Sequence, residues 1–401
     1  MVSLGGRIEM RNPVVEMEGD EMAKILWDMV KGELLEPFVE LKTWRFDLSL
    51  RGRDETDDGI TLEAARAVLE AGVGVKCATV TPTIEEAKSL RLKRAYRSPN
   101  ATIREVLDGV IVRRPIAVEG IRPLVSRWKR PIVVARHAYG DLYGAFEEIL
   151  RPGDEARLTV RRADGSEEVH SLVPGKEAVI SLQHNLKSSI EFFARTCFSY
   201  ALEHHLNVLF AAKDTVSKVY DGTFRRTFEE VYREFEEDFK ARGLSFEYRL
   251  IDDALSQLLR CEGGLLWACK NYEGDVFSDM VASAFGGLGL MTSELISPTG
   301  ARLYEAAHGT VRRHYLARLR GERTSTNPVA TVFAWTGALR FRGKLDGDPE
   351  LISFAEGLEG AVERVLLSGI VTKDLGELFG EGARVVDTEG FLEAVRGEMD
   401  R

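Results

Sequence analysis

The sequence of 401 residues lacks long apolar runs, an excess of positive charge and any cysteine framework. Because no stretch of about 18 apolar residues occurs, no transmembrane helix is predicted. The first ten residues show neither a signal-peptide core nor an Arg-rich amphipathic segment, so we expect a cytoplasmic protein. The net charge of −10 argues against a nucleic-acid partner. The cysteines, which form no C-x-x-C or zinc-type spacing and read as reduced thiols, are Cys77, Cys197, Cys261 and Cys269.

Side-chain amides are also scarce, because asparagine and glutamine together number eight. Arginine far outnumbers lysine. Depletion of thermolabile amides is typical of thermophiles, so we expect a heat-resistant protein. A GC-rich genome, which favours arginine codons, is the alternative explanation.

The order of predicted elements indicates the fold class. The chain is long enough for two or three domains. Helical spacing over 22–36 and 61–71 is followed by a buried strand over 73–81, and this alternation favours an α/β fold with a mostly parallel sheet. Gly72 is a plausible helix C-cap. Further helices are predicted over 188–203, 227–243, 276–285, 349–369 and 388–399, with a strand over 207–212.

The middle of the chain departs from this alternation. Apolar and polar residues alternate over 157–162 and 167–173, on either side of the sequence Ala-Asp-Gly-Ser. Asp-Gly between two such runs is a strong hairpin signal. We therefore predict a small β excursion within an α/β protein.

Two aspartates form the first candidate site. Asp275 and Asp279 are four residues apart in a predicted helix, so their carboxylates share one face about 6 Å apart. Oxygen ligands at that spacing suit Mg²⁺ or Mn²⁺. Asp252 and Asp253 are candidates for a third ligand. Taken alone, the pair is more often a solvated helix face.

Arginines form the second candidate site. Arg113 and Arg136 end apolar, strand-like segments, and Arg104 follows the sequence SPNATI. Guanidinium groups bind carboxylates bidentately, so three that converge on one cleft would suit a polycarboxylate. Surface salt bridges are the alternative. Tyr143 and Lys213 are candidates for proton transfer, although either residue alone is usually structural.

The segment 305–315, EAAHGTVRRHY, forms the third candidate site. The backbone at Gly309 and Thr310 can approach phosphate closely, and Arg313 and His314 add positive charge that suits a dinucleotide with a 2′-phosphate. An ordinary polar surface loop is the alternative. The fingerprint G-x-G-x-x-G is absent, so no Rossmann dinucleotide site is predicted.

Read together and in order, the motifs resemble the NADP-dependent isocitrate dehydrogenases, specifically the subfamily that includes the eukaryotic cytosolic and mitochondrial homodimeric enzymes. The motifs include NPVVEMEGDEMAKILW at 12–27, SPNATIR at 98–104, RHAYGDLY at 136–143, KDTVSKVYDG at 213–222, WACKNYEGDV at 267–276 and TSTNPVATVFAWTGA at 324–338. The resemblance covers nearly the whole chain and implies an enzyme of the tricarboxylic acid cycle.

The resemblance implies an isocitrate/isopropylmalate dehydrogenase-like α/β fold that is not a Rossmann fold. It implies a large domain over 1–107 and 286–401, a small domain over 108–140 and 187–285, and a clasp over 141–186 that is exchanged between two subunits. It further implies oxidative decarboxylation of isocitrate to 2-oxoglutarate and CO₂, with reduction of NADP and dependence on Mg²⁺ or Mn²⁺, in a homodimer whose active sites are shared.

Residue roles follow from the resemblance at matching positions. Isocitrate would be bound by Thr81, Ser98, Asn100, Arg104, Arg113 and Arg136. The metal would be bound by Asp275 and Asp279 of one subunit with Asp252 of the other. The proton-transfer pair would be Tyr143 and, from the neighbouring subunit, Lys213. NADP would be held by Lys76, Thr79, Thr81, His308, Gly309, Thr310, Val311, Arg313, His314 and Asn327, with Gln257 and Arg260 of the partner.

Three positions depart from the pattern of the resembled family. Glu86 stands where many of its members carry an arginine that contacts the cofactor, Arg260 replaces a frequent lysine, and Asp214 replaces a frequent asparagine. Two other functions remain open. A sister enzyme acting on 3-isopropylmalate or homoisocitrate would need a different pocket. A non-catalytic binding protein would have broken site residues, whereas every expected one is present.

Overall fold

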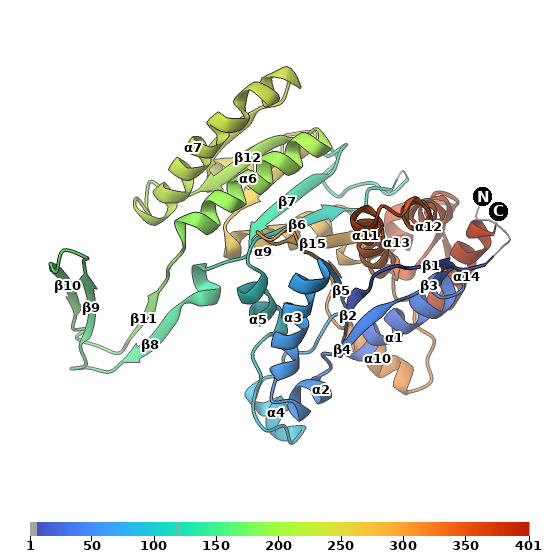
Figure 1. Ribbon diagram of the computed structural model, residues 1–401, viewed down its shortest axis with the longest axis horizontal. Coiled ribbons are helices and arrows are strands. Elements are labelled where there is room, and N and C mark those ends of the chain that lie inside the picture. The colour runs from blue at the N-terminus through green and yellow to red at the C-terminus, as the bar shows by residue number, and fades with distance from the viewer. Residues whose placement is uncertain (1–5, 119, 401) are drawn as a thin grey trace.

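A single mixed sheet runs through the molecule in the computed structural model, which describes residues 6–118 and 120–400 (Figure 1). Two blocks of parallel strands are joined in the middle by antiparallel neighbours, because β7, β6, β15 and β16 pair antiparallel in succession. The order across the described sheet is β13 (Phe246–Leu250), β12 (Asn207–Ala212), β14 (Leu265–Cys269), β7 (Ile132–His137), β6 (Val110–Pro115), β15 (Met291–Ile296), β16 (Arg302–Ala306), β5 (Val73–Lys76), β2 (Val14–Glu18) and β4 (Thr43–Asp47).

Helices cover both faces of the half that ends at β4. One face packs on a core that includes Trp27 and Trp335, and the other on a core that includes Val68 and Ile103. The helices of this half are α1 (Glu21–Val30), continued by a π-helical turn (Lys31–Leu35), α2 (Leu50–Glu55), α3 (Gly59–Ala71), α4 (Ile84–Ser89), α5 (Pro99–Leu107), α10 (Arg312–Leu319), α11 (Val329–Asp346), α12 (Pro349–Leu367), α13 (Lys373–Phe379) and α14 (Thr388–Met399), with a 3₁₀ turn at Leu288–Leu290. Four short strands form two further parallel pairs, β1 (Ile8–Glu9) with β3 (Val39–Glu40) and β17 (Ile370–Val371) with β18 (Arg384–Val385).

The half that ends at β13 has a distinctly aromatic core. The helices α6 (Lys187–His204) and α7 (Tyr220–Ala241) cover one face, where the rings of Phe210 and Phe228 stack with centroids 4.1 Å apart. The helices α8 (Ile251–Leu258) and α9 (Asn271–Ala284) cover the opposite face, around Trp267. Among the described residues, each half therefore has two hydrophobic cores, one on each side of the sheet.

An arm of two successive two-stranded sheets extends away from both halves (Figure 1). Strands β8 (Phe146–Leu150) and β11 (Ala178–Leu182) pair antiparallel at its base, and β9 (Ala156–Arg161) and β10 (Glu167–Leu172) form the hairpin at its tip. The hairpin turn lies at the predicted Asp-Gly, where Gly165 has a φ of 85°. A 3₁₀ turn, Asp141–Gly144, leads into the arm.

Most predicted elements are present, with shifts at their ends. The strand predicted over 73–81 stops at Lys76, because the chain then turns to pack against Gly19. The helix predicted over 227–243 begins earlier, at Tyr220. Gly72 caps α3 with a φ of 78°, as predicted. The predicted alternation is confirmed, although the centre of the sheet is antiparallel. No described helix combines the length and the apolar character needed to cross a membrane.

Candidate active site

The three arginines predicted to bind a polycarboxylate come together. Arg113 lies on β6 and Arg136 on the neighbouring β7, while Arg104 projects from α5. Arg136 is completely buried, and its pKa is lowered to about 10 by burial and by the nearby charge of Arg104. Two buried donors, Arg113 Nε and Arg136 Nη2, have no hydrogen-bond partner among the described residues. Such donors are costly unless an anion satisfies them, so the cluster is suited to bind one.

The two aspartates of α9 face this arginine cluster. Asp275 pairs with Arg136, and Asp279 pairs with Arg113 at 2.9 Å. Burial is the largest single influence on Asp275 and disfavours its ionisation. The charge of Arg136, the hydrogen bond from Tyr143 and the charges of Arg113 and Arg104 together outweigh burial, so the pKa of Asp275 is lowered. Burial dominates at Asp279, whose pKa is raised. The sheet and α9 thus hold opposite charges in contact.

Close packing of α9 on β7 fixes this contact. A Cβ atom at Gly274 would lie 2.7 Å from the Cβ of Arg136, so only glycine permits the approach. Asn271, the first residue of α9, accepts a hydrogen bond from Arg136 Nε at 2.8 Å. Asn271 and Asp275, which are one turn apart on α9, therefore both hold the Arg136 guanidinium.

Tyr143 closes the cluster from the 3₁₀ turn before the arm. Its hydroxyl donates to Asp275 Oδ2, and the Arg136 guanidinium lies 4.8 Å from the centre of its ring. Burial and the Asp275 carboxylate raise the pKa of Tyr143 to about 12, so the phenol stays protonated at neutral pH. Arg104, Arg136 and Tyr143 line a cavity of about 340 Å³. Ser98 is the N-cap of α5 and Asn100 lies in its first turn, on the same helix as Arg104.

Lys213 and Asp252 form a separate pair. Lys213 follows β12, and its Nζ contacts Asp252 at the start of α8. Both side chains are substantially exposed, at 38% and 66%. Within the part of the chain that the structure describes, no three His, Cys, Asp or Glu side chains are arranged to hold a metal ion. The three predicted metal ligands are thus not assembled within one chain.

The segments predicted to bind the dinucleotide lie at the ends of β5 and β16. Lys76 is buried, and its Nζ donates to Cys77 O at 3.0 Å. Glu305 links the two predicted sites, because its carboxylate lies 3.8 Å from Lys76 and 3.7 Å from Arg104. Val311 adopts a φ of 54°, a conformation that is strained for a β-branched residue.

Some of the remaining predicted cofactor residues form hydrogen bonds with other described side chains, and Arg313 does not. His314 contacts Thr326 Oγ1 at 2.8 Å, and Asn327 donates to Asp374 at 3.0 Å. Arg313 is exposed and makes no side-chain hydrogen bond or ion pair with a described residue. Gln257 lies on α8 and Arg260 just after it, on the same segment as Asp252.

Glu86, the acidic departure near the cofactor segments, is not a free anion. One carboxylate oxygen accepts from Thr83 N at 2.9 Å in the capping box of α4, and the other accepts from Arg312 at 2.9 Å. These hydrogen bonds from Thr83, with the charge of Arg312, lower the pKa of Glu86. Its charge is therefore neutralised by a neighbour within the fold.

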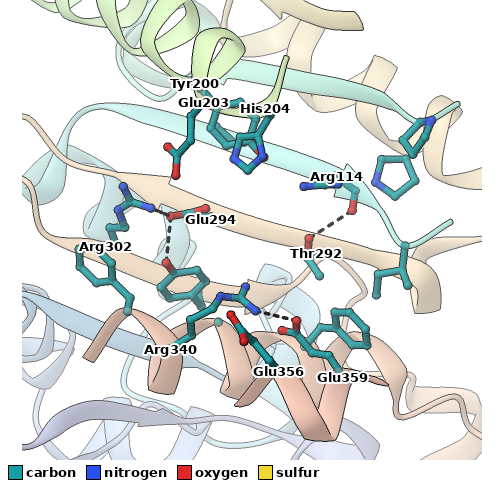
Figure 2. Close-up of a pocket in the computed structure, with 18 of the residues that line it drawn as sticks. Arg114, Tyr200, Glu203, His204, Thr292, Glu294, Arg302, Arg340, Glu356 and Glu359 are labelled. Atoms are coloured by element: carbon teal, nitrogen blue, oxygen red, sulfur yellow. Dashed lines mark hydrogen bonds and ion pairs between the residues drawn. The ribbon is translucent and has the colours of Figure 1, made fainter. Parts of the chain in front are cut away.

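A larger cavity, of about 570 Å³, lies on the opposite face of the same central strands (Figure 2). Successive residues of a strand face opposite sides, so Arg114 and Glu294 line this cavity while Arg113 and Ser293 face the arginine cluster. Its central charges are paired with each other, Arg302 with Glu294 and Arg340 with Glu359, both at 2.6 Å. We therefore place the candidate active site at the smaller cavity, which is lined by Arg136 with its unpaired buried donor.

Comparison with known proteins bears on the whole chain. Residues 9–395 match the family model described as isocitrate/isopropylmalate dehydrogenase. The chain belongs to this family. "Isocitrate dehydrogenase [NADP] 1" of Mycobacterium bovis is 46% identical over 98% of both chains. The cytoplasmic NADP enzyme of Saccharomyces cerevisiae is 42% identical over 98% of both chains, and the human mitochondrial one is 42% identical over 98% of this chain and 90% of its own.

The isocitrate/isopropylmalate dehydrogenase family match spans both groups of predicted residues, the arginine cluster and the Lys213–Asp252 pair. Sequence reasoning missed several residues that support them. Asn271 and Glu305 lie within the quoted motifs, but their roles depend on contacts between distant segments. Asp221 accepts a hydrogen bond from Lys213 N at 2.8 Å. It could have been found from the sequence, because it lies eight residues after Lys213 in the same motif, at the start of the next helix.

Proposed function

We propose that this protein catalyses the oxidative decarboxylation of isocitrate to 2-oxoglutarate and CO₂ with reduction of NADP. The observation that carries the proposal is the arginine cluster beside two aspartates and a protonated tyrosine. In this cluster Arg113 and Arg136 are buried, and each has an unpaired donor. A tricarboxylate satisfies several guanidinium groups at once. The names of the relatives point to the same reaction.

NADP would be held by residues of two segments, by Asn327 and by two residues of the partner subunit. They are Lys76, Thr79, Thr81, His308, Gly309, Thr310, Val311, Arg313, His314 and Asn327, with Gln257 and Arg260 of the partner. The support is that these segments lie next to the arginine cluster, joined through Glu305. Arg313 is free to pair with a 2′-phosphate, and such a charge-assisted contact has no counterpart in NAD. When bound, NADP would supply the hydride acceptor, and these side chains would hold it beside the substrate site.

A divalent cation fits the site only if a third carboxylate joins Asp275 and Asp279. Both aspartates are at present neutralised by Arg113 and Arg136, which the substrate carboxylates would engage instead. We propose Asp252 of the partner subunit as that third ligand. When bound, Mg²⁺ or Mn²⁺ supplies Lewis-acid polarisation of the substrate hydroxyl and stabilises negative charge during decarboxylation.

Proton movements fall to two side chains. Lys213 of the partner subunit would accept the proton of the substrate hydroxyl as hydride leaves the neighbouring carbon. Tyr143, protonated in the resting protein, would donate a proton to the carbon that loses CO₂. Arg104, Arg113 and Arg136 would hold the carboxylates throughout.

A homodimer with shared sites would bring Lys213 and Asp252 to the arginine cluster. Supporting this proposal, α9 carries exposed apolar side chains at every fourth position, Tyr272, Val276 and Met280, beside its aspartates. The arm also exposes apolar residues, including Phe146, Ile149 and Val179. We propose that the arm, over 141–186, is a clasp exchanged between subunits, with a large domain over 1–107 and 286–401 and a small domain over 108–140 and 187–285.

A direct assay tests the proposed reaction. Purified protein should reduce NADP when isocitrate and Mn²⁺ are supplied, as followed by NADPH absorbance. The same assay with 3-isopropylmalate or homoisocitrate, and with NAD in place of NADP, should give much lower kcat/KM. Turnover of 3-isopropylmalate in preference to isocitrate would overturn the substrate assignment. Full activity of EDTA-treated protein without added metal would overturn the metal assignment.

We also propose a cytoplasmic, heat-resistant protein from the composition of the chain. Scarce amides and abundant arginine support heat resistance. A melting temperature above the mesophile range of about 45–65 °C is expected by calorimetry. A value within that range would leave genome composition as the explanation.

A further inference from the structure

The turn between β2 and α1 touches both segments proposed to bind NADP. On one side, Asp20 accepts a hydrogen bond from Val80 N at 2.8 Å, and its own N–H donates to Ala78 O at 2.9 Å. On the other side, Glu21 accepts from the Thr310 hydroxyl at 2.5 Å. The turn therefore connects the loop after β5 to the loop before α10.

Arg312 extends this connection to a third element. Its Nε lies 3.6 Å from Glu21 on α1, and its Nη1 lies 2.9 Å from Glu86 on α4. Glu86 is itself fixed, because the capping box of α4 holds its other oxygen on Thr83 N. One guanidinium thus ties the start of α10 to two helices that are far from it in sequence.

The backbone joined in this way is strained at two positions. Glu21 has a φ of 56° and Val311 a φ of 54°. A non-glycine residue in this region costs roughly 1–3 kcal/mol and persists only where its surroundings hold it. Val311 lies directly between Thr310 and Arg312, the two residues that contact Glu21. The contacts that hold the strain are therefore the ones on either side of it.

We propose that Arg312 is a positioning residue, which with Glu21 and Glu86 clamps residues 309–313 in their cofactor-binding conformation before NADP arrives. This inference rests on the proposed function, since it takes that segment as the cofactor site. Strain that is already held by the fold does not oppose binding, which is the general benefit of preorganisation.

The clamp differs from a phosphate contact in one measurable way. Arg312 already has two carboxylate partners, so it brings no net positive charge to a ligand. Its loss should therefore weaken NADP and NAD by the same factor. Arg313, which has no such partner, should distinguish between them.

A double-mutant cycle tests the clamp. The variants are Arg312→Gln, Glu86→Gln and the double variant, and glutamine at 86 retains the capping box. We expect each single variant to raise the Kd for NADP roughly 3- to 10-fold by isothermal titration calorimetry, and the double variant to raise it no further, because both remove one interaction. The KM for both cofactors should rise by the same factor with kcat unchanged. Amide hydrogen exchange at 310–312 should accelerate in the cofactor-free protein.

Arg318→Gln is the matched control, because Arg318 lies on the same helix and pairs with Glu389 at 2.8 Å, away from the loop. It should leave both Kd and amide exchange at 310–312 unchanged. Additive single effects, or an unchanged Kd in Arg312→Gln, would overturn the clamp, and a loss confined to NADP would show direct phosphate binding instead. A wild-type protein that binds NADP but does not reduce it with isocitrate would fail the proposed function while the Kd comparison still decides the clamp.

Discussion

The arginine cluster and the Lys213–Asp252 pair are built very differently, although both carry residues predicted to act on one substrate. Arg136 is completely buried and contacts Asn271, Asp275 and Tyr143, whereas the Lys213 and Asp252 side chains are 38% and 66% exposed. The first group lies between a sheet and a helix within the fold. The second lies on the surface, where an ion pair contributes little to stability.

The comparison shows that the Lys213 side chain is exposed although the backbone that carries it is held in place. Lys213 N donates to Asp221 at 2.8 Å, and Asp221 is buried and paired with Lys270 at 2.9 Å. The backbone is therefore fixed, while the ammonium group is presented outward. Such an arrangement suits a group that completes a site on another molecule. The proposed dimer brings the two groups together.

The largest expected effect comes from breaking both groups at once in separate chains. Lys213→Ala should lower turnover by at least about 100-fold, the smaller end of acid–base contributions. Arg136→Ala should also remove most activity, because it deletes a buried guanidinium that would hold a substrate carboxylate. Co-expressed, they should recover activity, because one site of each mixed two-fold dimer lacks both defects. Random pairing makes about half the dimers mixed, so roughly a quarter of all sites should be intact. NADPH formation by the co-purified mixture is the measurement.

The control is a mixture of the same two variants purified separately and combined without exchange, which should remain inactive. If differently tagged mixed dimers are isolated and show no recovery, each site belongs to a single chain. The contrast between the two groups would then reflect stability alone.

Asp275→Asn probes the buried group through its proposed metal. Loss of this carboxylate should lower Mn²⁺ affinity by more than the roughly 10- to 100-fold that loss of an outer-shell partner costs. The fold should survive, because Arg136 retains Asn271 as a partner. Mn²⁺ titration of activity measures the effect, and Glu273→Gln on the same helix, which pairs with Lys270, serves as the control. Full activity of the Asp275→Asn protein after EDTA treatment and desalting would contradict the assignment.

Arg313→Ala extends the comparison to a second exposed cation. A charge-assisted contact to the 2′-phosphate predicts a rise in the NADP KM of roughly 10- to 100-fold, with little change for NAD. Steady-state kinetics with both cofactors measure the ratio. Equal losses for NADP and NAD would mean that Arg313 does not bind the phosphate, and that exposure at this position carries no ligand role.

The last prediction concerns the stability of the buried group and not its activity. His137 follows Arg136 on β7, and burial lowers its pKa to about 3. The unfolded chain therefore binds the proton more readily, so stability is fully present above about pH 6.5 and is lost as the pH falls toward 3. The change is on the order of 5 kcal/mol across this window. Melting temperatures against pH should fall less steeply in His137→Leu, whereas the exposed His170→Gln should follow the wild type.

Local patterns in the sequence predicted much of this arrangement and missed the contacts between distant segments. The strand at 207–212, the hairpin around Gly165 and the end of α3 at Gly72 depend on periodicity and turn chemistry, which are local. The strand predicted over 73–81 was too long, because its end is set by packing against Gly19, which periodicity does not encode.

The candidate site divides in the same way. The spacing of Asp275 and Asp279 predicted a shared helix face, and the structure confirms that both lie on α9 beside Arg113. The pairing of Glu86 with Arg312 joins positions 226 apart and had no local signal. The roles assigned from the resemblance to particular residues stay predictions until the variants are measured.

The central strands separate the two cavities, which lie on opposite faces of the sheet. On β15, Thr292 and Glu294 face the larger cavity (Figure 2). Ser293, which lies between them, faces the arginine cluster. A substitution on β15 affects one cavity. Deletion of a single residue would move every later side chain of the strand to the opposite face of the sheet, because the strand repeat is two residues. Loops can therefore vary in length without this effect, whereas these strands tolerate substitutions but not insertions or deletions.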